Sequence, residues 1–198
     1  DYDKAIELNP NYSDAYYNRA NAKSYLGNNE KAIEDYDKAI ELDPNISESY
    51  NNRGTVKVDL GLNKEAIKDY DKAIELNPNN SSAYNNRGTA KANLGLYQEA
   101  IEDYDKAIEL NPNNSEAYNN RGTAKANLEL YQEAIKNYNK AIELNPNISE
   151  AYNNRGTAKE NLGLNEEAIK DFDKAIELNP NNSSAYNNRG TAKANLGL

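Results

Sequence analysis

The chain has 198 residues, carries a formal net charge of −9 and contains 37% hydrophobic residues. It has no Cys and no His, which excludes disulfides, thiolate catalysis, Cys or His zinc sites and a histidine general base. The chain is acidic, has no basic stripe, and lacks an apolar run of about 18 to 20 residues. These features predict no nucleic-acid partner and no membrane partner, and nothing indicates a metal or a cofactor. Because the absence of Cys fits a reducing compartment, we expect a cytoplasmic location.

The six prolines stand 34 residues apart, and a serine follows each of them by three positions. A constant period of this length indicates a repeat architecture, in which one unit is too small to bury its own apolar face and stacked units share a core. Counting from the serines predicts a single array of five full repeats with a partial repeat at each end. The first partial repeat, 1–12, ends a second helix, and the last, 183–198, holds a first helix. The full repeats are 13–46, 47–80, 81–114, 115–148 and 149–182.

Each repeat contains two helical patterns, which the third repeat illustrates. The first predicted helix runs from about Ser82 to Leu94, and Gly95 suits a left-handed C-terminal cap. The second runs from about Gln98 to Leu110, with apolar residues at steps of three and four, as in an amphipathic helix. The Asn-Pro-Asn-Asn segment after it supplies N-cap candidates for the next helix. The sequence therefore predicts an all-α chain of helix pairs.

This pattern resembles the tetratricopeptide repeat over the whole chain. The residues that carry the resemblance in the third repeat are Tyr84, Gly88, Ala100, Tyr104, Ala107 and Pro112. The resemblance implies a right-handed superhelical solenoid of antiparallel helix pairs. It also implies that the first helices line a concave groove and that the second helices face outward.

Two positions depart from the family pattern in every repeat. Arg87 stands where the family commonly has Leu, and Lys91 stands where it commonly has an aromatic residue. These cations share one helical face, because they are four residues apart. Asp103 and Asp105 on the second helix are the expected partners. The arrangement indicates a partly buried ladder of ion pairs, and the alternative is an anion site.

The fourth repeat breaks the pattern at three positions. Asn137 and Asn139 replace two aspartates, and Glu129 stands where other repeats have glycine. We expect this repeat to be the least stable joint of the array.

The predicted groove face of the first helices is polar, small and largely uncharged. An asparagine amide offers two donors and an acceptor, so repeated amides suit the backbone of an extended peptide. Such an asparagine ladder lines the groove of some superhelical repeat proteins, and the alternative is a generic solvated groove. The candidate peptide-binding residues are Asn18, Asn51, Asn52, Asn85, Asn86, Thr89, Asn119, Asn120, Thr123, Asn153, Asn154, Asn187 and Asn188.

The predicted function is therefore a scaffold that binds a protein or peptide partner and that is not an enzyme, since no serine has a base near it. A second use of the family groove is the carboxylate clamp, which needs basic residues. The corresponding positions hold Asn51 or Asn85 and Ser82 or Glu116, none of which is basic, so the sequence does not favour a clamp. Two alternatives remain. The chain could be an architectural spacer that associates end to end, with weak head-to-tail self-association, or the substrate-recruiting arm of a larger enzyme.

Overall fold

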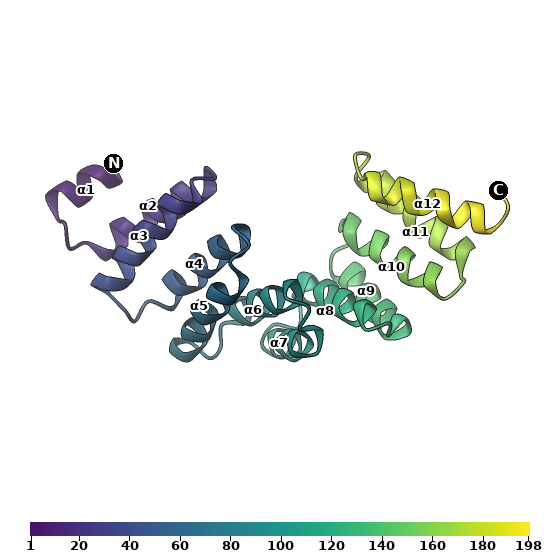
Figure 1. The fold of residues 1–198 in the computed structure, drawn as a ribbon, viewed down its shortest axis with the longest axis horizontal. Helices are drawn as coiled ribbons and strands as arrows, with labels where there is room; N and C mark the ends of the chain where they lie inside the picture. The colour runs from purple at the N-terminus through teal and green to yellow at the C-terminus, as the bar shows by residue number, and fades with distance from the viewer. The chain divides into compact units, whose positions relative to one another are not determined.

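The computed structural model describes residues 1–198, and every regular element in it is an α-helix. The helices divide between two compact units, residues 1–96 and 97–198, each built of helices joined by short turns (Figure 1). The first unit holds α1 (Tyr2–Leu8), α2 (Ser13–Tyr25), α3 (Asn29–Leu42), α4 (Ser47–Asp59), α5 (Asn63–Leu76) and α6 (Ser81–Asn93). The second unit holds α7 (Tyr97–Leu110), α8 (Ser115–Asn127), α9 (Tyr131–Leu144), α10 (Ser149–Asn161), α11 (Asn165–Leu178) and α12 (Ser183–Asn195).

The predicted all-α fold of antiparallel helix pairs is confirmed. The even-numbered helices are the first helices of the repeats, and the odd-numbered ones are the second helices. Within each unit a first helix packs on the second helix that follows it and on the second helix that precedes it. The division of the chain into repeats counted from the serines stays a prediction. None of the twelve helices has the length and apolarity that a bilayer crossing requires.

The turns follow the residues that the sequence places in them. Gly95 has a φ of +78°, which confirms the predicted left-handed cap, and glycines at equivalent positions have φ values of +75° to +77°. Asn80, Asn114 and Asn182 accept a hydrogen bond from the backbone N–H three residues later, and so cap α6, α8 and α12. Where this position holds Tyr12, Ile46 or Ile148, the helix has no side-chain cap. The asparagine caps therefore belong only to the turns that end in two asparagines.

In the pairs α4–α5, α8–α9 and α10–α11, an aromatic ring of the second helix packs on a glycine of the first, whereas the pair α2–α3 has Ala20 at the glycine position. Tyr70 and Phe172, on second helices, are at most 1% exposed. A Cβ atom on Gly54 would lie 2.8 Å from Cε1 of Tyr70, and one on Gly156 would lie 2.6 Å from Cε1 of Phe172. Because these separations are shorter than any real Cβ contact, glycine is required for the two helices to approach this closely. Buried alanines surround the rings.

Replacing Gly156 by Ala should destabilise the fold, because the new methyl group would displace the ring of Phe172. We expect a loss of about 1 to 3 kcal/mol in the free energy of unfolding, measured by urea denaturation. Gly190 occupies the same position 34 residues later, and no atom lies within 4 Å of the site of its Cβ. Gly190→Ala should therefore stabilise the chain by about 0.5 to 1 kcal/mol through helix propensity. Changes of the same sign in the two variants would contradict this account.

Glu129 occupies the turn position that glycine holds in the other repeats, and its φ is 61°. A side chain in this left-handed region costs about 1 to 2 kcal/mol. Glu129→Gly should therefore raise the free energy of unfolding by about 1 kcal/mol, and the reverse change Gly163→Glu should lower it similarly. Urea denaturation of both variants tests the expectation, which fails if Glu129→Gly is neutral or destabilising. The lower stability of the fourth repeat itself stays a prediction.

Candidate functional site

All of the candidate peptide-binding residues lie on the first helices. They come from α2 (Asn18), α4 (Asn51, Asn52), α6 (Asn85, Asn86, Thr89), α8 (Asn119, Asn120, Thr123), α10 (Asn153, Asn154) and α12 (Asn187, Asn188). Most of these side chains are half-buried, whereas Asn85 is buried and Thr123 and Asn187 are exposed. We call the surface that they form on each unit the asparagine surface.

The second asparagine of a pair donates hydrogen bonds to the preceding first helix. In the first unit, Nδ2 of Asn86 lies 3.3 Å from Oδ1 of Asn51. In the second unit, Nδ2 of Asn188 lies 3.2 Å from Oδ1 of Asn153 and 3.3 Å from Oγ1 of Thr157. These partners are 35 and 31 positions apart, so the fold brings together residues of consecutive repeats. The amides therefore help to hold neighbouring repeats together.

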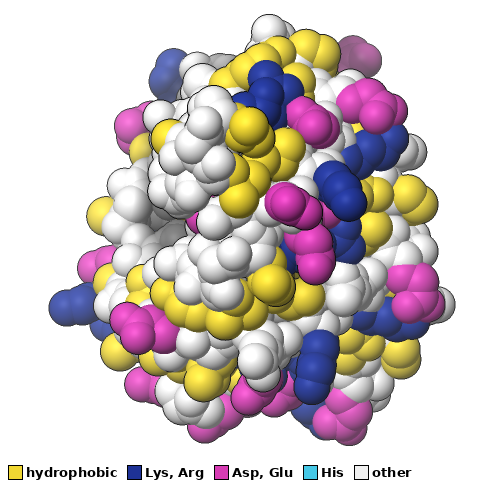
Figure 2. All heavy atoms as spheres, turned by 90° about the vertical axis from the view of Figure 1, so that its right-hand side faces the viewer, with side chains coloured by type: hydrophobic (Ala, Val, Ile, Leu, Met, Phe, Trp, Pro, Cys, Tyr) yellow, Lys and Arg dark blue, Asp and Glu magenta, His cyan; other side chains and the backbone are white.

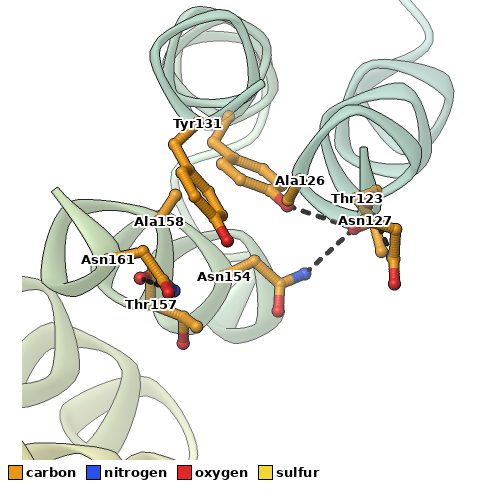
Figure 3. A pocket seen from close by; sticks show the side chains of 9 residues that line it. Thr123, Ala126, Asn127, Tyr131, Asn154, Thr157, Ala158 and Asn161 are labelled. Carbon is orange, nitrogen blue, oxygen red and sulfur yellow. Dashed lines mark hydrogen bonds between the residues drawn. The ribbon is translucent and has the colours of Figure 1, made fainter. Parts of the chain in front are cut away.

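The side-chain oxygen of Asn154 stays available as a hydrogen-bond acceptor. Its Nδ2 lies 3.4 Å from Oδ1 of Asn119 and 3.4 Å from Oγ1 of Thr123, so both of its N–H groups have acceptors within the protein. Figure 3 shows its nitrogen turned towards Thr123 and its oxygen turned away. No protein group donates to that oxygen. The asparagine surface therefore presents an amide acceptor whose orientation is held by its own donors.

This acceptor lies at a pocket between α8 and α10 with a volume of about 260 Å³ (Figure 3). The second helix α9 contributes Tyr131 and the buried Tyr138 to its lining. Burial raises the pKa of Tyr138 to about 12, so its hydroxyl stays protonated and donates to Oγ1 of Thr123, 3.3 Å away. No charged side chain lines this pocket. It offers small polar groups and the side chains of two tyrosines.

The first unit has a pocket of about 250 Å³ at equivalent positions of its repeats. Asn52 and Thr55 occupy the places of Asn154 and Thr157, and Tyr36 occupies the place of Tyr138. Nδ2 of Asn52 lies 3.1 Å from the hydroxyl of Tyr17 and 3.1 Å from Oδ1 of Asn21, which is the same pattern of donation. The two units therefore each carry a pocket of similar volume at equivalent positions, but the oxygen of Asn52 accepts a hydrogen bond from Nδ2 of Asn51, 3.1 Å away.

The tyrosines of the second helix are not among the residues predicted for this surface. Tyr131 is half-buried and lines the pocket of the second unit. Most repeats have asparagine at its position, namely Asn29, Asn63 and Asn165. This difference between repeats was the signal in the sequence that could have revealed it.

A different stripe of the first helices carries the ion-pair ladder, in which each arginine joins two repeats. In the second repeat, Nε of Arg53 lies 2.9 Å and its Nη2 lies 2.5 Å from the carboxylate of Asp69. Its Nη1 lies 2.6 Å from Oδ1 of Asp37 in the preceding repeat. The guanidinium also lies over the ring of Tyr50, 5.5 Å from the centroid, which suits a cation–π contact.

The prediction that Asp103 and Asp105 pair with Arg87 and Lys91 of their own repeat is wrong for Asp105, which pairs with Arg121 of the following repeat. The second aspartate of each pair belongs to the arginine of the following repeat, as Asp71 does to Arg87 and Asp105 does to Arg121. The reason is the helix itself, because residues two apart project to different sides and therefore face different neighbours. On the face seen in Figure 2, basic and acidic side chains lie next to one another.

Family models match most of the chain. The model described as Tetratricopeptide repeat matches residues 13–46, 81–114, 115–148 and 149–182, which is more than half of the chain. A second model with this description matches 35–68 and 172–198, and one described as TPR repeat matches 54–95. A search of curated protein sequences gave no significant match.

Several solved structures are similar to this chain. YrrB, described as a TPR protein with an unusual peptide-binding site, is 31% identical, with 94% of this chain and 96% of that chain covered and a TM-score of 0.72. MamA is 33% identical, with 80% and 93% covered and a TM-score of 0.72. The first TPR of Spaghetti (RPAP3), bound to the HSP90 peptide SRMEEVD, is 32% identical, with 60% and 94% covered and a TM-score of 0.58.

The ion-pair ladder should make the free energy of unfolding depend on pH. Burial by itself raises the pKa of Asp35, but hydrogen bonds from Arg19 and Lys23 and their charges bring it below its ordinary value of 3.8. This carboxylate therefore stabilises the fold above that pH, and the contribution is lost as the pH falls through the folded-state pKa. We expect Asp35→Asn to be less stable than the wild type at about pH 6 and to approach it below about pH 3. Urea midpoints at both pH values test this, and a pH-independent difference would contradict it.

Proposed function

This chain belongs to the tetratricopeptide repeat family, and we propose that it is a protein-interaction scaffold that binds an extended peptide on its asparagine surface. YrrB and the first TPR of Spaghetti support a peptide ligand, because each is described with a peptide or a peptide-binding site. The chain acts by binding and is not an enzyme in this proposal.

The observation that carries the proposal is the orientation of Asn154. Its two N–H groups bond within the protein, so its oxygen is held as an acceptor at the rim of the pocket. A peptide N–H is the complementary donor, and every residue of a ligand except proline has one. Binding through such oxygens selects an extended backbone more than it selects particular side chains.

The spacing of the repeats supports an extended ligand. Packed helices lie about 8 to 10 Å apart, and an extended chain advances about 3.3 Å per residue. About three ligand residues would therefore span one repeat. Each pocket then receives one side chain, and a volume near 250 Å³ with small polar walls favours a small or medium uncharged one.

Acidic tails are not the ligand that this surface favours. The peptide SRMEEVD in the Spaghetti structure has three acidic residues. The positions that would supply clamp cations here hold Asn51 or Asn85 and Ser82 or Glu116, so an acidic ligand would find no opposite charge. The alternatives of an architectural spacer with head-to-tail association, and of a substrate-recruiting arm, stay predictions.

A peptide library probed with the wild type and with a variant carrying Asn52, Asn86, Asn120 and Asn154→Ala tests the proposal. We expect the wild type to bind a set of uncharged extended peptides and the variant to lose at least about tenfold in affinity, because each backbone hydrogen bond contributes about 0.5 to 1.5 kcal/mol. A bound peptide in which one amide is replaced by an ester should also bind more weakly, since the ester removes the N–H donor.

The matched control replaces the same number of amides in the turns, at Asn45, Asn79, Asn113 and Asn147, whose side chains are exposed. Both variants must keep the helicity of the wild type by circular dichroism. Equal losses in the two variants, or ester peptides that bind as well as amides at every position, would contradict backbone recognition by the asparagine surface.

A further inference from the structure

The second, fourth and fifth repeats allow a controlled comparison at one position. Around the arginine of the ladder, each has two lysines and a glutamate at equivalent places. The second and fifth repeats add the buried aspartates Asp69 and Asp171, whereas the fourth has Asn137. The fourth repeat therefore has the same cations and one carboxylate fewer.

In the repeats that keep the aspartate, its two oxygens serve three donors. In the fifth repeat, Nε and Nη2 of Arg155 lie 2.9 Å and 2.5 Å from the carboxylate of Asp171. Nζ of Lys159 lies 2.9 Å from the same carboxylate. The second repeat has the same arrangement around Asp69. One buried anion thus balances two cations.

Asn137 cannot take over this role, because an amide has one acceptor oxygen. That oxygen lies 2.7 Å from Nε of Arg121, and its Nδ2 donates to the carbonyl oxygen of Glu133, 2.8 Å away. Nη2 of Arg121 consequently has no acceptor within the protein. Lys125 turns instead to the carboxylate of Glu133, 2.7 Å away, whose side chain is 52% exposed.

These groups line a cavity of about 370 Å³, which we call the fourth-repeat cavity. One water takes about 30 Å³ in the liquid, so the cavity has room for a small anion and its remaining waters. The guanidinium of Arg121 is held over the ring of Tyr118, 5.3 Å from its centroid, and its Nη1 is held by Asp105. The lining residues are Tyr118, Arg121, Lys125, Glu133, Lys136 and Asn137.

We propose that the fourth-repeat cavity binds one small oxyanion, a phosphate or a carboxylate group. Three cations and the carboxylate of Glu133 line it, and Asp105 pairs with Nη1 of Arg121. Glu133 is exposed enough to be displaced by a stronger acceptor. Nη2 of Arg121 is the guanidinium nitrogen left to donate a charge-assisted hydrogen bond to an anion, because Nε and Nη1 bond to Asn137 and Asp105. Tyr118, Arg121 and Lys125 form a stripe on α8 separate from Asn119, Asn120 and Thr123. The site is therefore independent of the asparagine surface.

Equilibrium dialysis with radiolabelled inorganic phosphate, at neutral pH and constant ionic strength, tests the proposal. We expect one saturable site in the wild type. Asn137→Asp restores the carboxylate of the other repeats and should weaken binding at least about tenfold, because that carboxylate would take the donors of Arg121 and Lys125 that bind the anion. Asp171→Asn removes the carboxylate of the fifth repeat and should create a second site. A parallel arm with labelled acetate distinguishes carboxylate from phosphate.

Saturable binding of either anion that Asn137→Asp removes supports the proposal, and the tighter of the two identifies the ligand chemistry. An absence of saturable binding of both anions to the wild type would overturn it. Binding that is unchanged in Asn137→Asp would also overturn it, because the anion would then lie elsewhere. Circular dichroism establishes that each variant is folded, and the Asn137→Asp comparison decides the matter even if Asp171→Asn does not fold.

Discussion

The packing of an aromatic ring of the second helix on a small residue of the first, glycine in most repeats and Ala20 in the first, is the constraint on which the rest of the repeat depends. The ring of Tyr138 lies where a Cβ of Gly122 would be, with Cε1 only 2.7 Å from that position. This close approach fixes the rotation of the first helix about its axis. It therefore decides which residues of that helix face the neighbouring repeat and which reach the surface.

Within each unit, two polar networks then fasten first helices to the repeat before them, on different stripes of the helix. On one stripe, Arg53 joins Asp69 of its own repeat to Asp37 of the preceding one. On the other, Asn86 donates to Asn51 of the preceding first helix. Networks of this kind favour one arrangement of neighbours, because a slip would leave buried polar groups without partners. The same bonds orient the amide oxygens that the proposed ligand would meet.

The near identity of the repeats makes their differences informative. A buried aspartate replaced by Asn137 leaves Arg121 with one acceptor fewer, and a turn glycine replaced by Glu129 places a side chain at a φ of 61°. Both differences fall in the fourth repeat, which therefore combines backbone strain at Glu129 with a cavity that three cations and one carboxylate line. The chain as a whole has a formal net charge of −9, but the cations that line this cavity would attract an anion locally.

The sequence by itself determined the helix pairs, their boundaries to within about two residues, and the glycine and asparagine caps. These depend on residues close together in the chain, such as Asn80 with Ala83, so local periodicity and turn chemistry were enough. Only the tertiary structure decided that Asp71 pairs with Arg87 of the next repeat, that Tyr131 lines a pocket, and that the donors of Asn154 bond within the protein. These features depend on how one repeat stacks on another, and the sequence spacing alone does not specify which side of a helix meets its neighbour.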